Sequence, residues 1–337
     1  MHADVVVAGH TCLDVRPALD GPLDLEPGRL IRVGETVFAA GGAVANTGIA
    51  LHRLGVPVRL VAKIGPDPFG DVVREALGAH GLGGDLLVAP SEATSYSIVI
   101  DPPGVDRSFL HYPGANDTFS ADDVSDAAVA GARILHFGYP PLMQRMVAAG
   151  GAELELLLAR ARENGLVTSL DMCRVERGPV DWRAVLERVL PNVDIFCPSI
   201  DDLPFANDEP STFAGELLAM GAAAVAIKLG ERGLYLRTSG RVGDLCRKLG
   251  LDEAAWGDCE VSSPCFAVER VAGTTGAGDC TIAGLLAALL RGDDPAEVAT
   301  AATAVGACCV EAPDGASGIP PWAEVEARVR SGWATCA

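Results

Sequence analysis

The sequence contains no uninterrupted apolar run of about 18 residues, the length expected of a membrane-spanning helix. It also lacks a basic segment before its first apolar stretch, because Met-His-Ala-Asp leads directly into the strand-like residues 5–7. A secretory signal would begin with such a segment. We therefore expect a cytoplasmic protein with no membrane partner.

Basic residues are scarce. Lysine and arginine together number 26 against 45 aspartates and glutamates, which gives a net charge of −19. Nucleic acid and anionic membrane surfaces both require positive charge, so we expect neither as a partner. If the chain binds an anion such as ATP, local donors and a metal ion must hold that anion.

Aromatic residues are few, at 5% of the chain, although 49% of the residues are hydrophobic. The core must therefore consist mainly of alanine, valine, leucine and isoleucine. This composition favours an α/β fold, in which buried parallel strands appear as short apolar runs.

The ten cysteines include no C-x-x-C pair. Without a secretory signal, reduced thiols are expected. Cys308 and Cys309 lie in an alanine-rich helical pattern and are predicted to be core thiols. Cys246, Cys259 and Cys265 have no nearby histidine and do not match usual zinc spacings, which argues against a zinc site.

Common nucleotide-binding motifs are missing as well. No G-x-x-x-x-G-K-[ST] loop occurs, and no G-x-G-x-x-G follows the first predicted strand. The first absence argues against a P-loop enzyme, and the second leaves little support for a dinucleotide-binding fold.

What the chain does contain is a regular alternation of short apolar runs and amphipathic segments. We predict strands at residues 5–9, 30–33, 58–64, 95–100, 107–111, 134–138, 166–171, 194–197, 223–229, 234–237 and 267–271. We predict helices at 42–54, 69–78, 151–163, 182–189, 213–220, 282–290, 295–310 and 321–331, with irregular structure over 239–264. The alternation indicates a mostly parallel sheet covered on both faces. The segments near 30 and at 95–112 do not fit it and predict a small separate sheet.

One glycine-rich stretch stands where a β-prone run turns into a helix. Residues 271–281 read Val-Ala-Gly-Thr-Thr-Gly-Ala-Gly-Asp-Cys-Thr. A helix start presents unpaired N–H groups and a partial positive charge, and glycine lets a ligand approach the backbone, so the stretch suits phosphate. From these residues alone, a tight turn in which Asp279 complements the helix dipole is an equal alternative.

Polar residues gather after the predicted strands, where ligands bind in doubly wound sheets. They are Asp14, Asn46, Asp171, Arg174, Ser199, Asp202, Lys228 and Asp279. Asp14 and Asn46 suit a ligand with several hydroxyl groups, because carboxylate and amide groups can pair with hydroxyls as acceptors and donors. A turn aspartate and a helix-capping asparagine are equally good readings of these two residues.

Two motifs together give the chain a resemblance to a known family. Residues 273–279, Gly-Thr-Thr-Gly-Ala-Gly-Asp, resemble the second signature of the ribokinase (PfkB) carbohydrate kinases, usually D-T-x-G-A-G-D. Residues 41–46, Gly-Gly-Ala-Val-Ala-Asn, resemble the first signature, G-G-x-x-x-N. Further landmarks match at Asp14, at Asp171 and Arg174, and at residues 228–233.

The resemblance covers essentially the whole chain and implies a ribokinase-like three-layer α/β sandwich. The implied architecture is one kinase domain over residues 1–337, with a mostly parallel central sheet and a small β lid formed by about 12–36 and 93–114. Lids of this family often pair, so a homodimer through the lid is expected.

The implied activity is transfer of the γ-phosphoryl group of ATP, with Mg²⁺, to a hydroxymethyl group of a sugar or related polyol. Asp279 would be the base, kept ionised by its place at a helix start. The N–H groups of Gly276, Ala277 and Gly278 would stabilise the transferring phosphoryl group. The implied substrate-binding residues are Asp14, Gly41, Gly42, Asn46, Arg107 and His111. The implied ATP-binding residues are Arg174, Ser199, Lys228, Gly230, Gly233, Thr275 and Gly278.

Several positions depart from the family pattern. Gly273 replaces an aspartate that helps to bind an activating monovalent cation, so dependence on K⁺ is in question. The N-x-x-E motif appears as residues 199–202, Ser-Ile-Asp-Asp, and leaves Asp202 as an indirect, water-mediated Mg²⁺ contact. Cys173 stands at a frequent asparagine, and Thr281 at a common phenylalanine.

Two alternatives to a sugar kinase are carried forward. A nucleoside kinase of the same family would use aromatic side chains to stack the base, and few aromatic residues lie near Asp14 or the lid. A catalytically silent sugar-binding regulatory protein is favoured by the altered motifs but opposed by the intact Gly-Ala-Gly-Asp segment.

Overall fold

A mostly parallel central sheet runs through the computed structural model, which describes residues 2–21, 23, 26–104, 107–174, 180–206, 208–314 and 316–336. Eight strands of this described part pair in the order β14-β13-β12-β11-β10-β9-β1-β4. Their bounds are β1 (Val5–Gly9), β4 (Val58–Val61), β9 (Ile134–Gly138), β10 (Val167–Leu170), β11 (Ile195–Phe196), β12 (Ala224–Lys228), β13 (Leu234–Thr238) and β14 (Glu260–Ser263). All neighbours pair in parallel except at one edge, where β13 and β14 are antiparallel.

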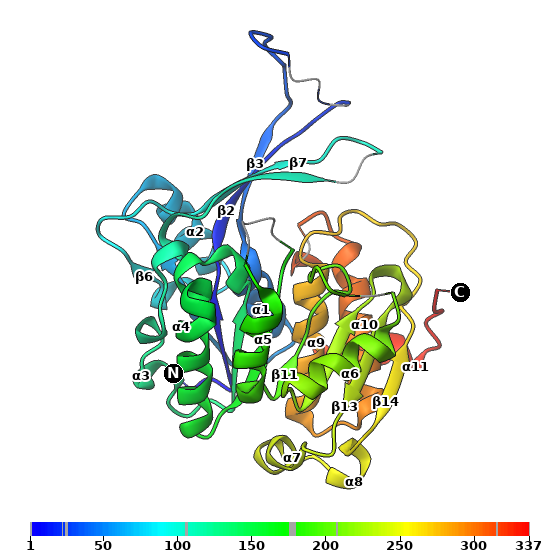
Figure 1. Cartoon of the computed structure of the whole chain (residues 1–337). Coiled ribbons are helices and arrows are strands. Elements are labelled where there is room, and N and C mark those ends of the chain that lie inside the picture. The colour runs from blue at the N-terminus through cyan, green and yellow to red at the C-terminus, as the bar shows by residue number, and fades with distance from the viewer. Residues whose placement is uncertain are drawn as a thin grey trace.

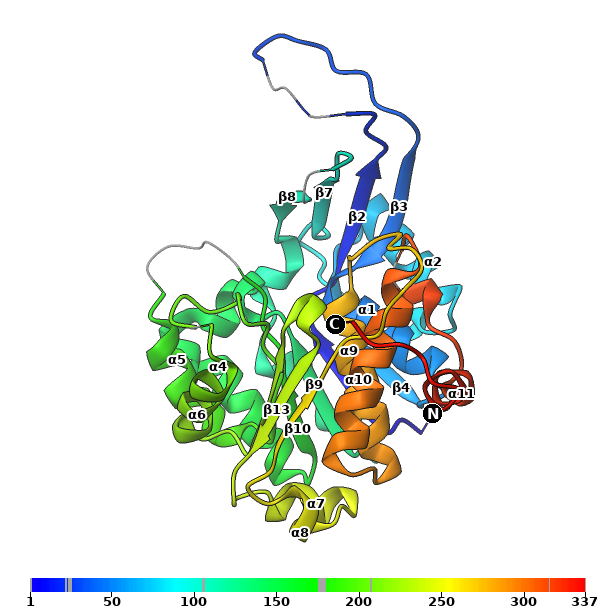
Figure 2. The same cartoon turned by 90° about the vertical axis from the view of Figure 1, so that its right-hand side faces the viewer.

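Helices cover both faces of this sheet (Figures 1 and 2). One face carries α3 (Asp126–Val129), α4 (Gln144–Glu163), α5 (Trp182–Val189) and α6 (Pro210–Met220). The other packs against α1 (Gly42–Arg53), α2 (Pro68–Gly78), α7 (Gly243–Leu249), α8 (Glu253–Trp256), α9 (Ala277–Arg291), α10 (Pro295–Val310) and α11 (Trp322–Arg330). The predicted three-layer α/β architecture is confirmed. In the described part of the chain, no helix is both long and apolar enough to cross a membrane.

The continuous apolar strands follow from this double coverage. Along β1, Val5 and Val7 join the core on the α1 side, whereas Val6 and Ala8 join the core on the α4 side. Successive strand residues point to opposite faces, so both sets must be apolar when both faces are buried. This is why apolar runs in the sequence located the strands of the sheet other than the edge strand β14.

A small separate sheet stands above the carboxyl edge of the central sheet (Figure 1). Its order is β3-β2-β7-β8, with bounds β2 (Cys12–Pro17), β3 (Thr36–Gly41), β7 (Tyr96–Ile100) and β8 (Ser108–Tyr112). The predicted hairpin near 95–112 forms as β7 and β8. A further short pair joins β5 (Lys63–Ile64) to β6 (Leu87–Val88).

Several predicted elements were wrong. Residues 30–33 form no strand, and the strands there are β2 and β3, which pair with each other across a long connection. Residues 267–271 are not a strand either, so the glycine-rich stretch follows an extended segment rather than a strand. Residues 239–264 are not irregular, because they contain α7, α8 and the edge strand β14. Local propensity could not reveal partners this distant in sequence.

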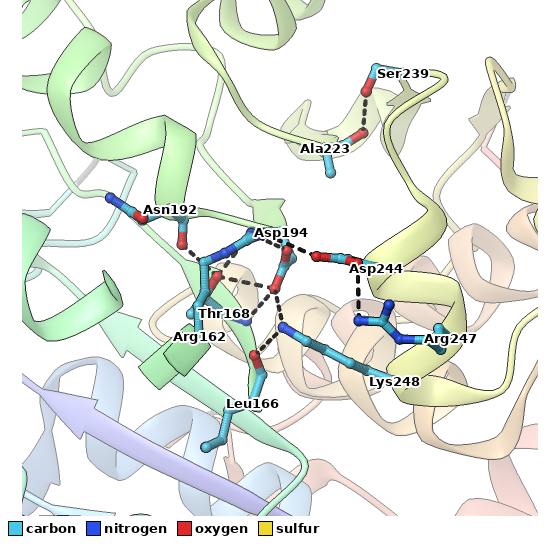
Figure 3. Close-up of polar contacts among 10 residues, drawn as sticks. All are labelled: Arg162, Leu166, Thr168, Asn192, Asp194, Ala223, Ser239, Asp244, Arg247 and Lys248. Carbon is cyan, nitrogen blue, oxygen red and sulfur yellow. Dashed lines mark hydrogen bonds and ion pairs between the residues drawn. The ribbon is translucent and has the colours of Figure 1, made fainter. Parts of the chain in front are cut away.

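At the opposite, amino-terminal edge of the sheet lies a polar cluster formed by Arg162, Thr168, Asp194 and Lys248 (Figure 3). Asp194, just before β11, is buried and accepts a hydrogen bond from the Thr168 N–H at 2.9 Å. It also pairs with Arg162 of α4 and lies 3.8 Å from the Lys248 ammonium of α7. The cluster therefore ties two helices, one from each face, to the edge remote from the glycine-rich stretch.

Candidate active site

The glycine-rich stretch forms a tight turn into α9. Gly276 has φ 78°, a left-handed conformation that glycine adopts without steric cost, and α9 begins at the next residue. A Cβ atom at Gly276 would lie 3.2 Å from the Asn46 side chain, so the turn packs closely against α1. Within the turn, the Ala277 N–H donates to the Thr274 carbonyl at 3.2 Å.

The Asp279 carboxylate is buried in the first turn of α9 and is anchored on one side only. Its Oδ2 atom accepts hydrogen bonds from Asn46 Nδ2 at 2.9 Å and from the Tyr139 hydroxyl at 3.0 Å. Its Oδ1 atom is buried and has no hydrogen-bond partner among the described residues. One carboxylate oxygen thus remains available to a ligand.

The pKa of Asp279 is set by its buried surroundings. Burial raises the pKa of this carboxyl, and hydrogen bonds from Asn46 and Tyr139 together with the charge of Lys228 offset the rise only in part. The group is consequently a stronger base than a solvent-exposed aspartate.

Asp14 of β2 is a second buried carboxylate, held against the glycine pair. A Cβ atom at Gly41 would lie 2.4 Å from Asp14 Oδ2, so only glycine leaves room for this carboxylate. A Cβ atom at Gly42 would likewise lie 2.5 Å from His10 Nδ1. Burial raises the pKa of Asp14 to about 6. The Cys12 thiol donates to Asp14 Oδ1 at 3.3 Å.

A buried ion pair lies at the carboxyl ends of β10 and β12. The Lys228 ammonium contacts Asp171 Oδ1 at 2.6 Å, and both side chains are buried. Burial raises the pKa of Asp171 to about 7 despite the attraction of Lys228. Burial alone would lower the pKa of Lys228, but the carboxylates of Asp171 and Asp202 reverse this and raise it. Lys228 therefore stays positively charged.

A cavity of about 580 Å³ opens beside this pair and the start of α9. Of the sequence-predicted residues, it is lined by Ser199, Lys228, Gly230, Gly233, Ala277 and Gly278. Thr275 is not a lining residue, and Thr274 takes its place. Asp202 lies just outside, where Oδ2 accepts from the Ser199 N–H at 2.7 Å. Arg174 is exposed and forms no hydrogen bond or ion pair with the described residues.

One wall of the cavity brings two cysteines together. Cys265 and Cys336 both line it, and their sulfur atoms are 2.7 Å apart. Backbone hydrogen bonds join the same two segments, from the Cys336 N–H to the Cys265 carbonyl and from the Ala267 N–H to the Ala334 carbonyl. In the described part of the chain, no group of three or more histidine, cysteine or acidic side chains is arranged to hold a metal ion.

The small sheet reaches down to the glycine-rich turn. Arg107 contacts the hydroxyl and the carbonyl of Thr274, and Arg16 Nη1 donates to the Pro313 carbonyl at 2.8 Å. His111 lies on the side facing the site, since its Nδ1 atom is 2.9 Å from the Ser97 hydroxyl and its ring lies 5.2 Å from that of His10.

Three residues near the two carboxylates were not identified from the sequence: His10, Cys12 and Tyr139. Tyr139 immediately follows β9 and precedes two prolines, which is a turn signal at a strand end. That signal could have marked the position, but not the contact with a residue 140 positions away.

The fold and the site together define a ribokinase-like kinase, with polar groups at the carboxyl edge of a parallel sheet and a small sheet above them. The family model described as pfkB family carbohydrate kinase matches residues 2–322. The chain belongs to this family, and it is a phosphotransferase of the sugar or nucleoside kinase class.

Similar proteins agree with this assignment. An uncharacterized sugar kinase of Archaeoglobus fulgidus is 26% identical over 276 residues, which cover 81% of this chain and 98% of the relative. A nucleoside kinase of Methanothermobacter thermautotrophicus is 25% identical over 98% of this chain and 96% of its own. The structure of Arabidopsis thaliana ribokinase complexed with ribose and ATP superposes with a TM-score of 0.76 at 21% identity, covering 97% and 98% of the two chains.

Proposed function

We propose that this protein transfers the γ-phosphoryl group of ATP to a hydroxymethyl group of a sugar or sugar derivative. The observation that carries the proposal is the Oδ1 atom of Asp279, buried and unpartnered among the described residues at the start of α9. A base in this position can accept the proton of an acceptor hydroxyl as that hydroxyl attacks phosphorus.

The residues divide into an acceptor end and a phosphate end. Asp14 and Asn46 lie on the acceptor side of Asp279 and offer the mixed acceptors and donors that a polyol requires. Lys228 lies at the phosphate end, beside Gly278. Gly278 lines the same cavity as Lys228, and the N–H groups of Gly276 and Gly278 would stabilise the transferring phosphoryl group. The Ala277 N–H must first leave the Thr274 carbonyl to join them.

The 580 Å³ cavity fits the nucleotide, because it extends from Lys228 and Gly278 along apolar residues of α10. Ala307 and Val310 supply the apolar surface that an adenine ring would cover. The small sheet would act as the lid, with Arg107 already on the turn that contains Thr274. A closed lid would keep water away from the phosphate.

Mg²⁺ fits the carboxylates at the phosphate end. Asp171 Oδ2 is buried and unpartnered among the described residues, and Asp202 is close enough to affect the ionisation of both Asp171 and Lys228. Such oxygen ligands suit a hydrated Mg²⁺ ion. When bound, the ion would neutralise phosphate charge.

A nucleoside kinase is the second candidate. The ring of His10 lies 5.2 Å from that of His111 and 6.1 Å from that of Tyr139, and ring faces can stack a base. A nearly full-length relative is also named as a nucleoside kinase. Sugar phosphorylation is favoured because the same site is rich in buried hydrogen-bonding groups.

We also infer that the lid pairs with a second copy of the chain. Its outer strands expose apolar side chains, namely Val37 at 57%, Phe38 at 55%, Phe109 at 48% and Leu110 at 56%. Exposed apolar side chains gathered on one small sheet are typical of a protein interface. Sedimentation of the wild type and of Leu110→Glu tests this, and equal molecular masses would contradict it.

The test of the enzyme function is ADP release with ATP, Mg²⁺ and a panel of sugars, sugar acids and nucleosides. We expect turnover with at least one sugar, and a loss of about 10²–10⁴-fold in kcat for Asp279→Asn, because the base is removed. Thermal stabilisation by a sugar without any turnover would favour a silent binding protein. Selective turnover of nucleosides would favour the second candidate.

A further inference from the structure

Tyr139 occupies an unusual backbone position at the carboxyl end of β9. It has φ 62° and ψ 46°, the left-handed region that non-glycine residues seldom adopt. Pro140 follows, and a proline disfavours the right-handed helical conformation in the residue before it. Strained conformations of this kind persist where the surrounding structure imposes them, and they concentrate at functional sites. The position directs the tyrosine ring toward Asp279.

The tyrosine hydroxyl and the Asn46 amide converge on the same atom. Tyr139 donates to Asp279 Oδ2 at 3.0 Å, and Asn46 Nδ2 donates to this oxygen at 2.9 Å. A carboxylate has about four lone-pair sites on its two oxygens, so two donors on one oxygen leave the other free. Asn46 comes from α1 and Tyr139 from the end of β9, so the carboxylate is held from two sides.

We propose that Tyr139 is a positioning residue that fixes Asp279 Oδ2 and so presents Oδ1 to the acceptor hydroxyl. This inference rests on the proposed function, in which Asp279 is the base. As the acceptor oxygen bonds to phosphorus and the bond from phosphorus to the leaving ADP oxygen breaks, Oδ1 takes the hydroxyl proton. The phenol keeps its own proton throughout and acts only as a donor.

The surroundings of the phenol support a donor that does not ionise. Burial, together with the nearby carboxylates of Asp279 and Asp171, raises the pKa of Tyr139 well above its ordinary value. A phenol in this environment remains protonated over the working pH range. It stabilises the ionised form of Asp279 and thereby lowers the pKa of that carboxyl.

The test compares wild type with Tyr139→Phe, which keeps the ring and removes the hydroxyl. We expect kcat to fall by roughly tenfold, less than the loss expected on removal of the base itself, while KM for ATP is unchanged. The acid limb of the kcat–pH profile should move to higher pH, since the variant loses a hydrogen bond that favours the carboxylate. Asparagine tolerates the left-handed backbone, so Tyr139→Asn can replace the phenylalanine variant if that variant does not fold. We expect the same changes in kcat and in the acid limb for Tyr139→Asn.

Tyr235→Phe is the matched control. Tyr235 lies on β13, and its hydroxyl interacts with Glu260 and Arg237 rather than with a residue of the site. Removing that hydroxyl should leave kcat and the acid limb unchanged. A Tyr139→Phe enzyme with the wild-type acid limb would overturn the proposal, as would one in which only the acceptor KM rises.

A second readout does not require turnover. The Asp279 carboxyl can be titrated by ¹³C NMR in aspartate-labelled protein, with Asp279→Asn used to assign its signal. Tyr139→Phe should raise its pKa, and an unchanged pKa would refute the hydrogen bond on which the inference rests. If the pKa rises but wild type phosphorylates no acceptor, the positioning contact stands and the proposed function fails.

Discussion

Burial strongly affects the ionisation of individual carboxylates in this site. Asp14 is buried over Gly41, and its pKa of about 6 lies well above the usual value for an aspartate. A buried carboxylate destabilises the folded chain when it is ionised, unless a ligand compensates for the lost solvation. The burial of Asp14 is therefore better explained by ligand binding than by a contribution to the stability of the fold.

The first prediction concerns Asp14→Asn. The folded pKa lies above the unfolded value of 3.8, so the folded chain binds the proton more tightly and ionisation lowers stability as pH rises from about 4 to 6. At pH 7 the amide variant should be more stable by about 1–3 kcal/mol, a gain that vanishes below pH 4. Thermal unfolding at both pH values checks this.

The same substitution should impair the acceptor end. In wild type, KM for the acceptor should rise as pH falls through about 6, because Asp14 then loses its charge. In the asparagine variant this pH dependence should disappear and KM should stay high. A variant that is both less stable and unaffected in KM would contradict the assignment of Asp14.

A second residue-scale prediction concerns monovalent cations. Gly273 supplies no carboxylate, and a Cβ atom there would lie 3.1 Å from the Pro313 carbonyl. Arg16 already donates to that carbonyl at 2.8 Å. These groups do not fit a K⁺ site, so kcat should be equal in potassium chloride and in tetramethylammonium chloride of equal ionic strength. Several-fold activation by K⁺ would refute this.

The sequence identified those site residues whose role follows from a local pattern. Asp279, Gly276 and Gly278 belong to one glycine-rich turn, and Asn46 follows the Gly41–Gly42 pair, so short motifs located them. Tyr139 and Cys12 could not be located in this way. The contact of Tyr139 with Asp279 depends on how distant segments pack. Cys12 lies two residues before Asp14 in β2, a strand that the sequence did not predict.

At the scale of helices and strands, burial on two faces made the central sheet predictable. Strands β1, β9 and β12 are buried throughout because helices cover both faces, and they are apolar except for His136 and Lys228. In the small sheet, β2 and β3 mix polar and apolar residues and pair across a long connection, so they were not recognised. The sequence also missed the beginning of α4. It predicted a helix over 151–163, whereas α4 begins at Gln144 and has a kink at residues 148–151.

The polar cluster at the amino-terminal edge gives an element-scale prediction. Asp194→Ala leaves the Thr168 N–H without its acceptor and removes the partner of Arg162 and Lys248 (Figure 3). We expect a loss of about 2–4 kcal/mol in the free energy of unfolding, measured in urea, with acceptor KM unchanged.

Asp244→Asn is the control for this cluster. Its side chain is 50% exposed and pairs with Arg162 and Arg247 at the surface. Exposed pairs contribute little, so its unfolding free energy should lie within about 0.5 kcal/mol of wild type. Equal losses in the two variants would show that burial of Asp194 is not what matters.

In the molecule as a whole, a buried polar cluster and the candidate active site lie at opposite edges of one sheet. The buried cluster around Asp194 lies at the amino ends of the strands (Figure 3). Asp171, Lys228 and Asp279 lie at the carboxyl edge. At the carboxyl edge, burial of Asp171 and Asp279 raises their pKa values, so their ionised forms lower the stability of the folded chain.

The cysteine pair in the cavity wall makes occupancy of the nucleotide site visible by alkylation. Cys265 and Cys336 are only partly buried and line the proposed ATP cavity, so bound ATP should slow their modification by a maleimide several-fold. Cys259 is equally accessible but lies outside that cavity, beside Thr238, and should react at the same rate with and without ATP. Peptide mass spectrometry after a short reaction measures both rates. Protection of all three cysteines, or of none, would place the nucleotide elsewhere. Selective protection of Cys265 and Cys336 would show that ATP binds in this cavity and would let alkylation report its occupancy.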